Sequence, residues 1–108
     1  MGDKLFSALS LCKKAGALAA GFDQVVENAA AGKAHLLLFA ADLSPNTRKR
    51  ALEQAPGLPV CNLPFTQEAL AAITRKPVGV LAVNNKDLAV LCLRSATEAG
   101  QPNKEEPV

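Results

Sequence analysis

Three polar residues follow Gly21 closely in the chain, and their side chains carry hydrogen-bond donors and acceptors: Asp23, Gln24 and Glu27. Polar and apolar residues recur there at helical spacing, which predicts a helix over residues 21–31. On the first turns of a helix, such side chains stand beside backbone N–H groups that have no partner within the helix. Two acids are favoured there by the helix dipole alone. A solvated helix face and a binding face are therefore both open interpretations.

Two basic segments are the other charged features that could meet a ligand. Arg48, Lys49 and Arg50 follow one another, and Arg75 and Lys76 stand just before a proline. Basic runs occur on exposed helix faces and also on surfaces that bind anions. Residue type alone leaves both interpretations open for each segment.

The remaining reactive side chains form no catalytic or metal-binding pattern. The single histidine, His35, has no serine or cysteine nucleophile placed beside it by a recognisable motif, so we interpret it as a packing or turn residue. Cys12, Cys61 and Cys92 are far apart, flanked by apolar residues and lack zinc or redox spacing, which indicates buried thiols in a reducing compartment. Without a phosphate loop, triad or metal cluster, we expect no enzyme activity, no metal and no cofactor.

The composition predicts one domain with an aliphatic core. The chain has 108 residues, about half of them hydrophobic, with four Phe and no Trp or Tyr. The net charge is +2, but residues 1–94 hold 11 basic and 7 acidic residues, while the last residues are acidic. This weak positive bias permits an anionic partner without requiring one. We expect a cytoplasmic protein, because no apolar run is long enough for a membrane span and no apolar signal region opens the chain.

The chain alternates between predicted helices and predicted strands. Ser44 followed by Pro45, and Thr66 further on, are typical of helix starts, because hydroxyl side chains cap helices and proline fits the first helical position. Unbroken apolar runs predict strands that are buried on both faces. The predicted helices are 3–15, 21–31, one from Pro45 to the PGLP stretch, and 67–74, and the predicted inner strands are 36–40, 59–63 and 79–83.

The end of the chain is harder to assign from its pattern. Residues 84–87 predict a turn, and the apolar run 88–93 fits a strand or a helix equally well. From residue 95 onward there is too little to bury, so we expect disorder there. Strands alternating with helices predict a layered α/β/α sandwich formed by residues 1–94, with no second domain.

Across residues 12–50 the sequence resembles the bacterial, YlxQ-type members of the ribosomal protein L7Ae/L30e family, whose wider superfamily binds kink-turn RNA. The resemblance rests on motifs that keep the family's spacing without a gap: Lys13-Lys14-Ala15-Gly16, Gly21, Gly32-Lys33-Ala34, the strand 36–40, Asp42 and Asn46-Thr47-Arg48-Lys49. Residues 68–83 resemble the family's fourth helix, exposed loop and last inner strand. The likeness covers about residues 3–94.

The resemblance implies a fold and a function. The fold is a three-layer α/β/α sandwich with a four-stranded mixed sheet, in which residues 88–96 form the last helix. The function is non-catalytic binding of structured RNA of the kink-turn type by a monomeric protein that associates with the ribosome. The implied RNA-binding residues are Gly21, Phe22, Asp23, Gln24, Glu27, Lys33, Arg75, Lys76, Pro77 and Val78. In this interpretation helix N–H groups hold a phosphate, Gln24 pairs with a purine edge, and the loop cations neutralise phosphates.

Three positions depart from the family's pattern. Kink-turn binders carry Lys where this chain has Ala17, Asn or Lys where it has Asp23, and Lys where it has Glu27. A carboxylate left unpaired about 4 Å from a phosphate costs on the order of a few kcal/mol near a protein surface. Asp23 can instead accept from guanine N–H groups. The alternative hypothesis is therefore a diverged paralogue that binds kink-turns weakly or not at all and acts through a protein partner.

Overall fold

The computed structural model describes residues 3–98. Four strands form one mixed sheet in the order β1-β4-β2-β3, with β2 and β3 parallel and the other two pairs antiparallel. The strands are β1 (Leu18–Ala20), β2 (Leu36–Phe39), β3 (Val60–Asn62) and β4 (Val80–Val83). The predicted class, an α/β/α sandwich with a four-stranded mixed sheet, is confirmed.

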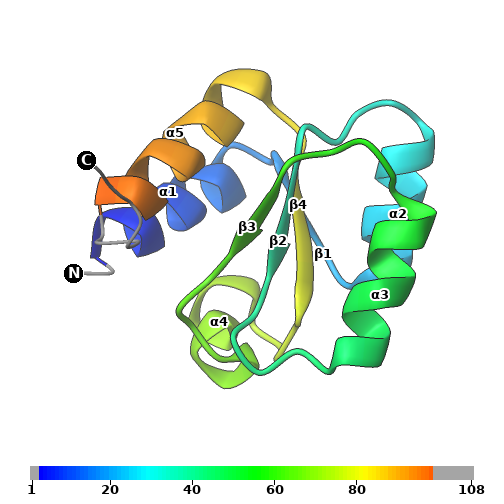
Figure 1. Cartoon of the computed structure of the whole chain (residues 1–108). Coiled ribbons are helices and arrows are strands. Elements are labelled where there is room, and N and C mark those ends of the chain that lie inside the picture. The colour runs from blue at the N-terminus through cyan, green and yellow to red at the C-terminus, as the bar shows by residue number, and fades with distance from the viewer. Residues whose placement is uncertain (1–2, 99–108) are drawn as a thin grey trace, which may run out of the picture.

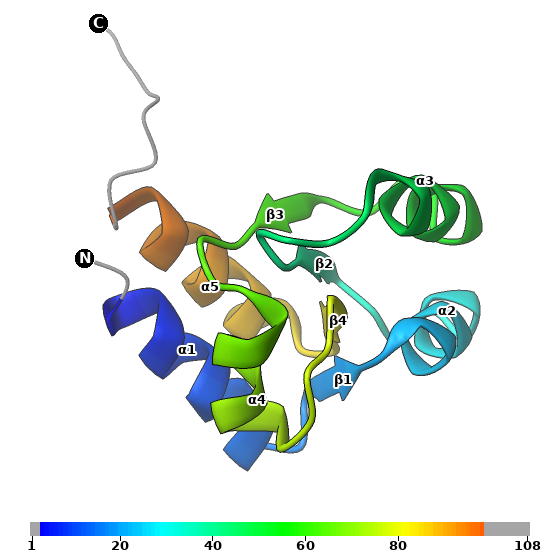
Figure 2. The same cartoon turned by 90° about the horizontal axis from the view of Figure 1, so that it is seen from below.

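Within residues 3–98, five helices cover the two faces of this sheet. They are α1 (Asp3–Lys14), α2 (Phe22–Ala30), α3 (Pro45–Gln54), α4 (Gln67–Thr74) and α5 (Lys86–Glu98). Seen from below, α1, α4 and α5 lie on one side of the sheet and α2 and α3 on the other (Figure 2). β1 descends to the lower edge of the molecule in Figure 1, where α2 begins and where the chain from α4 enters β4.

The two inner strands, β2 and β4, are buried on both faces, which explains their unbroken apolar sequences. Alternate side chains of a strand point to opposite faces. Leu36 and Leu38 accordingly pack in the cluster formed with α1, α4 and α5. Leu37 and Phe39 pack in the cluster formed with α2 and α3. One sheet thus separates two hydrophobic cores.

The predicted helix starts are confirmed by their capping bonds. Ser44 Oγ accepts from the N–H of Thr47 over 3.2 Å, and Thr66 Oγ1 accepts from the N–H of Ala69 over 3.1 Å. Asn85 does more than shape a turn, because its Oδ1 accepts from the N–H of Leu88 over 2.9 Å at the start of α5.

Three details of the secondary structure differ from the sequence-based expectations. β1 was not predicted from its residues, because a strand of Leu-Ala-Ala is too short to give a period. β3 was predicted as an inner strand but lies at the edge of the sheet, next to β2 alone. The run 88–93 is helical, as the resemblance implied, within an α5 that begins at Lys86.

The helix α5 also corrects the expectation of disorder from residue 95 onward. It continues to Glu98, and Ser95 and Ala96 are 5% and 4% exposed. Ala96 packs in the core cluster with α1. Burial therefore keeps one more turn of α5 helical, although the polar composition predicted disorder there. The rest of the predicted tail, residues 99–108, lies outside the described residues.

Two of the three cysteines meet in space although they are far apart in sequence. Cys12 on α1 and Cys92 on α5 are fully buried, with their Sγ atoms 3.6 Å apart as a thiol hydrogen bond. This bond lowers the pKa of Cys12 and, together with burial, raises the pKa of Cys92. Burial alone raises the pKa of Cys61. All three are buried free thiols, as predicted.

Candidate nucleic-acid interface

The N-terminus of α2 is fastened to the start of β4. The N–H of Gly21 donates to the carbonyl of Val80 over 2.9 Å, extending the ladder in which Ala20 pairs with Leu81. Figures 1 and 2 both place this helix end and the chain entering β4 at the same edge of the sheet. The segments 21–27 and 75–78, which the sequence kept far apart, therefore share one edge.

Gly21 is required by its backbone conformation. It is the N-cap of α2, with φ 101° and ψ 146°, a region open almost only to glycine. A Cβ at this position would meet no atom within 4 Å, so the space around it is open. No side chain caps α2, and the carbonyl of Gly21 accepts the N–H of Val25. The N–H groups of the first turn consequently face outward for a ligand.

The side chain of Gln24 is oriented by the edge strand. Its Oε1 accepts from the N–H of Ala20 over 3.2 Å, while the N–H of the next residue, Gly21, is used by the sheet. This contact covers an outward-pointing N–H of β1. Within the part of the chain that the structure describes, Nε2 of Gln24 makes no hydrogen bond. Gln24 can thus offer its two Nε2 donors to a purine edge, while its acceptor is used by the edge strand.

The two acids of α2 are both exposed. Among residues 3–98, neither Asp23 nor Glu27 forms an ion pair, and neither side chain accepts a hydrogen bond. Asp23 lies in the first turn, where the dipole stabilises a negative charge, and Glu27 lies one turn further along. Their charges are left facing solvent or a ligand.

The loop before β4 begins with a sharp reversal. Arg75 ends α4 in the left-handed conformation, with φ 76°, and its N–H donates to the carbonyl of Ala71 over 2.7 Å. The hydroxyl of Thr74 donates to the carbonyl of Lys76 over 2.7 Å, which fixes the turn. The side chains of Arg75, Lys76 and Pro77 are exposed.

Two apolar residues of the predicted site pack mainly against the hydrophobic cores. Val78 is half-buried and packs against the core formed with α1, α4 and α5. Phe22 is half-buried and packs against the core formed with α2 and α3. Each leaves part of its surface at the edge, but packing explains most of its burial.

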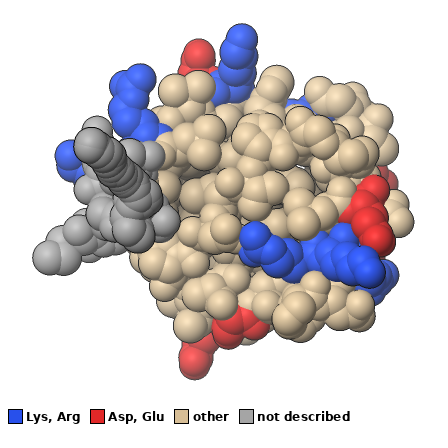
Figure 3. Space-filling model, viewed as in Figure 1, with Lys and Arg blue, Asp and Glu red and all other residues tan. Residues whose placement is uncertain are grey.

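Arg50 is a cation at this edge that the sequence-based list missed. Its guanidinium carbon lies 4.8 Å from the centre of the Phe22 ring, so α3 brings a positive charge to the first residue of α2. Arg48 lies over Phe39 in the same way, 4.9 Å away. Figure 3 shows lysine and arginine side chains gathered in a band over α3. The basic run 48–50 was visible in the sequence. Only the packing of α3 against α2 shows that Arg50 lies at this edge.

Lys33 lies beyond the other end of α2, away from Gly21. It is exposed and lines a polar hollow of about 470 Å³ together with Gln24, Asn28, His35 and Asn84. In this hollow Asn28 Nδ2 donates to the Gln24 carbonyl over 2.7 Å. Asn84 Nδ2 donates to Asn28 Oδ1 over 3.2 Å. The hollow connects Lys33 to Gln24 along one side of α2.

Two classes of site are not found in the described part of the chain. Residues 3–98 contain no group of three or more His, Cys, Asp or Glu side chains able to hold a metal ion. No helix there has the length and apolar character needed to cross a membrane.

The fold defines the class of protein: an α/β/α sandwich. At one edge of its sheet, a helix N-terminus lies beside the cationic loop that precedes an inner strand. Within that class, the chain belongs to the Ribosomal protein L7Ae/L30e/S12e/Gadd45 family, whose model matches residues 3–106. No curated protein gave a significant sequence match.

Solved structures share this fold. A protein of unknown function from Bacillus halodurans is 24% identical, with a TM-score of 0.78 over 87% of this chain and 97% of that chain. The Giardia lamblia 15.5kD RNA binding protein is 20% identical, with a TM-score of 0.65 over 88% of this chain and 83% of that chain. At these identities the likeness is one of fold.

Proposed function

We propose that this chain is a non-catalytic RNA-binding protein that recognises structured RNA of the kink-turn type. The observation that carries the proposal is the bond from Gly21 to Val80, because it joins the N-terminus of α2 and the loop 75–78 into one exposed edge. Membership of a ribosomal protein family and the fold shared with a protein named as RNA-binding support it.

Each part of the edge has a distinct role in the proposed complex. The open N–H groups of the first turn of α2 hold a phosphate, since a helix N-terminus carries a partial positive charge. The Nε2 donors of Gln24 pair with purine acceptors. Arg75 and Lys76 neutralise phosphates of the neighbouring strand, and Arg50 adds a cation beside Phe22.

The two carboxylates have different roles in this proposal. Asp23, in the first turn, accepts from the N–H groups of a guanine. Glu27 lies one turn further along and opposes the phosphates of the bound RNA. Affinity is therefore lower than a lysine at position 27 would give.

We also propose a setting for this activity: a cytoplasmic, monomeric protein that associates with ribosomal RNA or the ribosome. Membership of a ribosomal protein family supports the ribosomal association. In this proposal the domain of residues 1–94, followed by the end of α5 and the acidic tail, is the RNA-binding unit.

A second candidate is favoured by the exposed carboxylates of Asp23 and Glu27, which have no ion-pair partner among residues 3–98. In this alternative the chain is a diverged paralogue that has lost tight kink-turn binding and acts through a protein partner. The two candidates differ in the salt dependence of RNA binding, because displaced counterions make phosphate contacts sensitive to salt.

The test is a titration of a kink-turn hairpin, with a straight duplex of equal length and charge as the control. We expect the hairpin to bind at least about tenfold more tightly, a difference of about 1.4 kcal/mol, and both affinities to fall with added salt. Equal binding of the two RNAs contradicts kink-turn recognition. Weak binding that does not respond to salt supports the diverged paralogue.

A further inference from the structure

The polar hollow between α2 and the edge strand β1 is the cavity that the proposed contacts leave unused. Its volume is about 470 Å³, within the range of about 300–1,000 Å³ that ligand sites span. Asn28, Lys33, His35 and Asn84 supply polar side chains to it, and no aspartate or glutamate of the described chain lines it. A site with a cation, an imidazole and amides but no carboxylate suits a ligand that carries negative charge.

Asn84, which lines the hollow, has an acceptor without a donor. Its Oδ1 is buried and has no hydrogen-bond partner in the described part of the chain. A chain of bonds fixes the orientation of this amide: Asn84 Nδ2 donates to Asn28 Oδ1 over 3.2 Å, and Asn28 Nδ2 donates to the Gln24 carbonyl over 2.7 Å. Because that carbonyl can only accept, turning either amide over would break the chain. The hollow therefore favours a ligand that brings a hydrogen-bond donor.

Lys33 and His35 supply donors for an anion. Both are exposed, and among residues 3–98 Lys33 forms no ion pair and the His35 ring makes no hydrogen bond. Their backbones are held in place, because the N–H of Lys33 donates to the carbonyl of Asn28 over 3.0 Å and the N–H of His35 donates to the carbonyl of Val83 over 2.8 Å. An ordered backbone thus places an ammonium group and a ring N–H at the same hollow.

The helix α2 connects this hollow to the candidate interface. Gly21 bonds to Val80, the first residue of β4, and Asn28 bonds to Asn84, just beyond its last residue, so α2 runs beside the whole of β4. The 9 residues of α2 span about 13–14 Å. A nucleic-acid strand that advances about 3.4 Å per nucleotide covers this distance in about four nucleotides. A strand held at the tip of α2 can therefore reach Lys33.

We propose that this hollow binds the ribose-phosphate backbone of the RNA, with a phosphate at Lys33 and His35 and the 2′-hydroxyl of a neighbouring ribose donating to Asn84 Oδ1. The inference rests on the proposed RNA-binding function and adds to it a contact that distinguishes RNA from DNA. The backbone of DNA offers acceptors only, whereas the 2′-hydroxyl of RNA is also a donor. Because Asn84 Oδ1 is buried, a small hydroxyl reaches it with less displacement of neighbouring side chains than the edge of a base.

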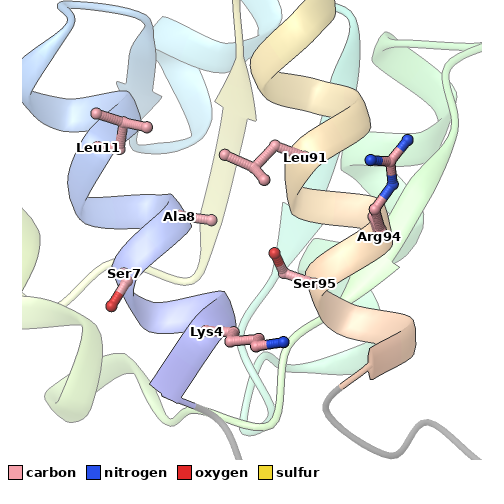
Figure 4. A pocket seen from close by; sticks show the side chains of 7 residues that line it. All are labelled: Lys4, Ser7, Ala8, Leu11, Leu91, Arg94 and Ser95. Carbon is pink, nitrogen blue, oxygen red and sulfur yellow. The ribbon is translucent and has the colours of Figure 1, made fainter.

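The groove between α1 and α5 serves as the control surface for this proposal (Figure 4). Ala8, Leu11 and Leu91 give it a mainly apolar lining. The two helices lie on the side of the sheet opposite α2 (Figure 2), and nothing in the structure shows what covers the groove. RNA bound along α2 should leave the amides of this groove unchanged.

The test measures binding of the full chain to a kink-turn hairpin in which one nucleotide at a time, over about four on either side of the kink, carries 2′-deoxyribose. We expect at least one position to lose affinity about three- to tenfold, the effect of one hydrogen bond. In Asn84→Ala the same position should lose less than about twofold, because the acceptor is gone. Lys76→Gln, in the loop before β4, is the control: it should weaken binding of every hairpin and keep the full deoxyribose penalty.

Lys33→Gln gives a second readout at an exposed residue, so it does not depend on the folding of Asn84→Ala. The slope of log affinity against log salt should become smaller by about one, because one phosphate contact is lost. Arg94→Gln removes the same charge from α5, on the other side of the sheet, and should leave the slope unchanged. A slope that Lys33→Gln does not change overturns the phosphate contact at this hollow.

The outcomes separate this inference from the proposed function. If no 2′-deoxy position weakens binding, or if Asn84→Ala leaves the penalty in place, the ribose contact is overturned, while tighter binding of the hairpin than of a straight duplex still supports kink-turn recognition. If hairpin and duplex bind equally, kink-turn recognition fails, and a single-stranded hexanucleotide in ribose and deoxyribose forms tests the hollow by amide shifts. Shifts at residues 28, 33, 35 and 84 with the ribose form alone support the inference. Equal shifts with both forms, or with a hexaglutamate peptide, overturn it.

Discussion

The N–H of Gly21 donates to the carbonyl of Val80 over 2.9 Å, and this bond aligns the first turn of α2 with the first residue of β4. The exposed cations Lys76 and Arg75 stand four and five residues before Val80 in the chain. The edge strand β1 thus acts as a spacer that sets the helix end beside the loop. The candidate interface depends on this backbone pairing more than on any one side chain.

Gly21→Ala should destabilise the fold and displace the tip of α2. A Cβ finds open space at this position, but φ 101° is strained for alanine, and we expect a loss of about 1–3 kcal/mol in the free energy of unfolding. Urea denaturation measures it. A free energy of unfolding equal to that of wild type would show that the backbone at Gly21 relaxes to an ordinary conformation.

Glu27→Lys should tighten binding of a kink-turn hairpin at least about tenfold, or about 1.4 kcal/mol, because it replaces a carboxylate facing the RNA with a cation. Glu53→Lys is the matched control, since it makes the same charge change on an exposed residue near the far end of α3. Equal effects of the two substitutions would assign the gain to net charge and remove Glu27 from the interface.

Arg50→Gln should weaken RNA binding about three- to tenfold and cost about 0.5–1 kcal/mol of stability, because the guanidinium lies over the Phe22 ring. Lys49→Gln removes one positive charge from the neighbouring exposed position and should change affinity less. Fluorescence anisotropy with the same hairpin measures both. If Lys49→Gln has the larger effect, the contact is a diffuse one along α3.

The buried thiol of Cys61 should make the fold less stable at alkaline pH. Burial raises the pKa of Cys61 above its ordinary value of 9.0, so the unfolded chain loses this proton more readily than the folded one. The contribution of Cys61 to stability is therefore complete below about pH 9 and declines as pH rises toward its folded pKa, by up to about 1.4 kcal/mol per pH unit. Urea unfolding at pH 8 and pH 10 should give a smaller decline for Cys61→Ala than for wild type. Equal declines would show that Cys61 ionises freely in the folded state.

Much of this architecture could be predicted from local signals. Ser44 and Thr66 mark helix starts because a hydroxyl caps unpaired N–H groups, and both caps are present. The strands β2 and β4 were visible because a strand buried on both faces must be apolar at every position. The resemblance supplied the helical state of 88–96, which periodicity could not decide.

What could not be predicted depends on contacts between distant segments. Neither the edge position of β3 nor the strand β1 has a local signature, because both follow from which strands pair. The meeting of Cys12 with Cys92 depends on α1 packing against α5. Likewise, no local pattern could show that the N–H of Ala20 on the edge strand occupies the acceptor of Gln24.

The most direct test of the central claim is an amide chemical-shift map of the full chain during titration with a kink-turn hairpin. We expect saturable shifts with one common affinity in two segments, residues 21–27 and residues 75–78, and none along α1 and α5. Shifts confined to one of those segments, or to α3 alone, would contradict the claim that the helix tip and the loop form a single RNA-binding surface.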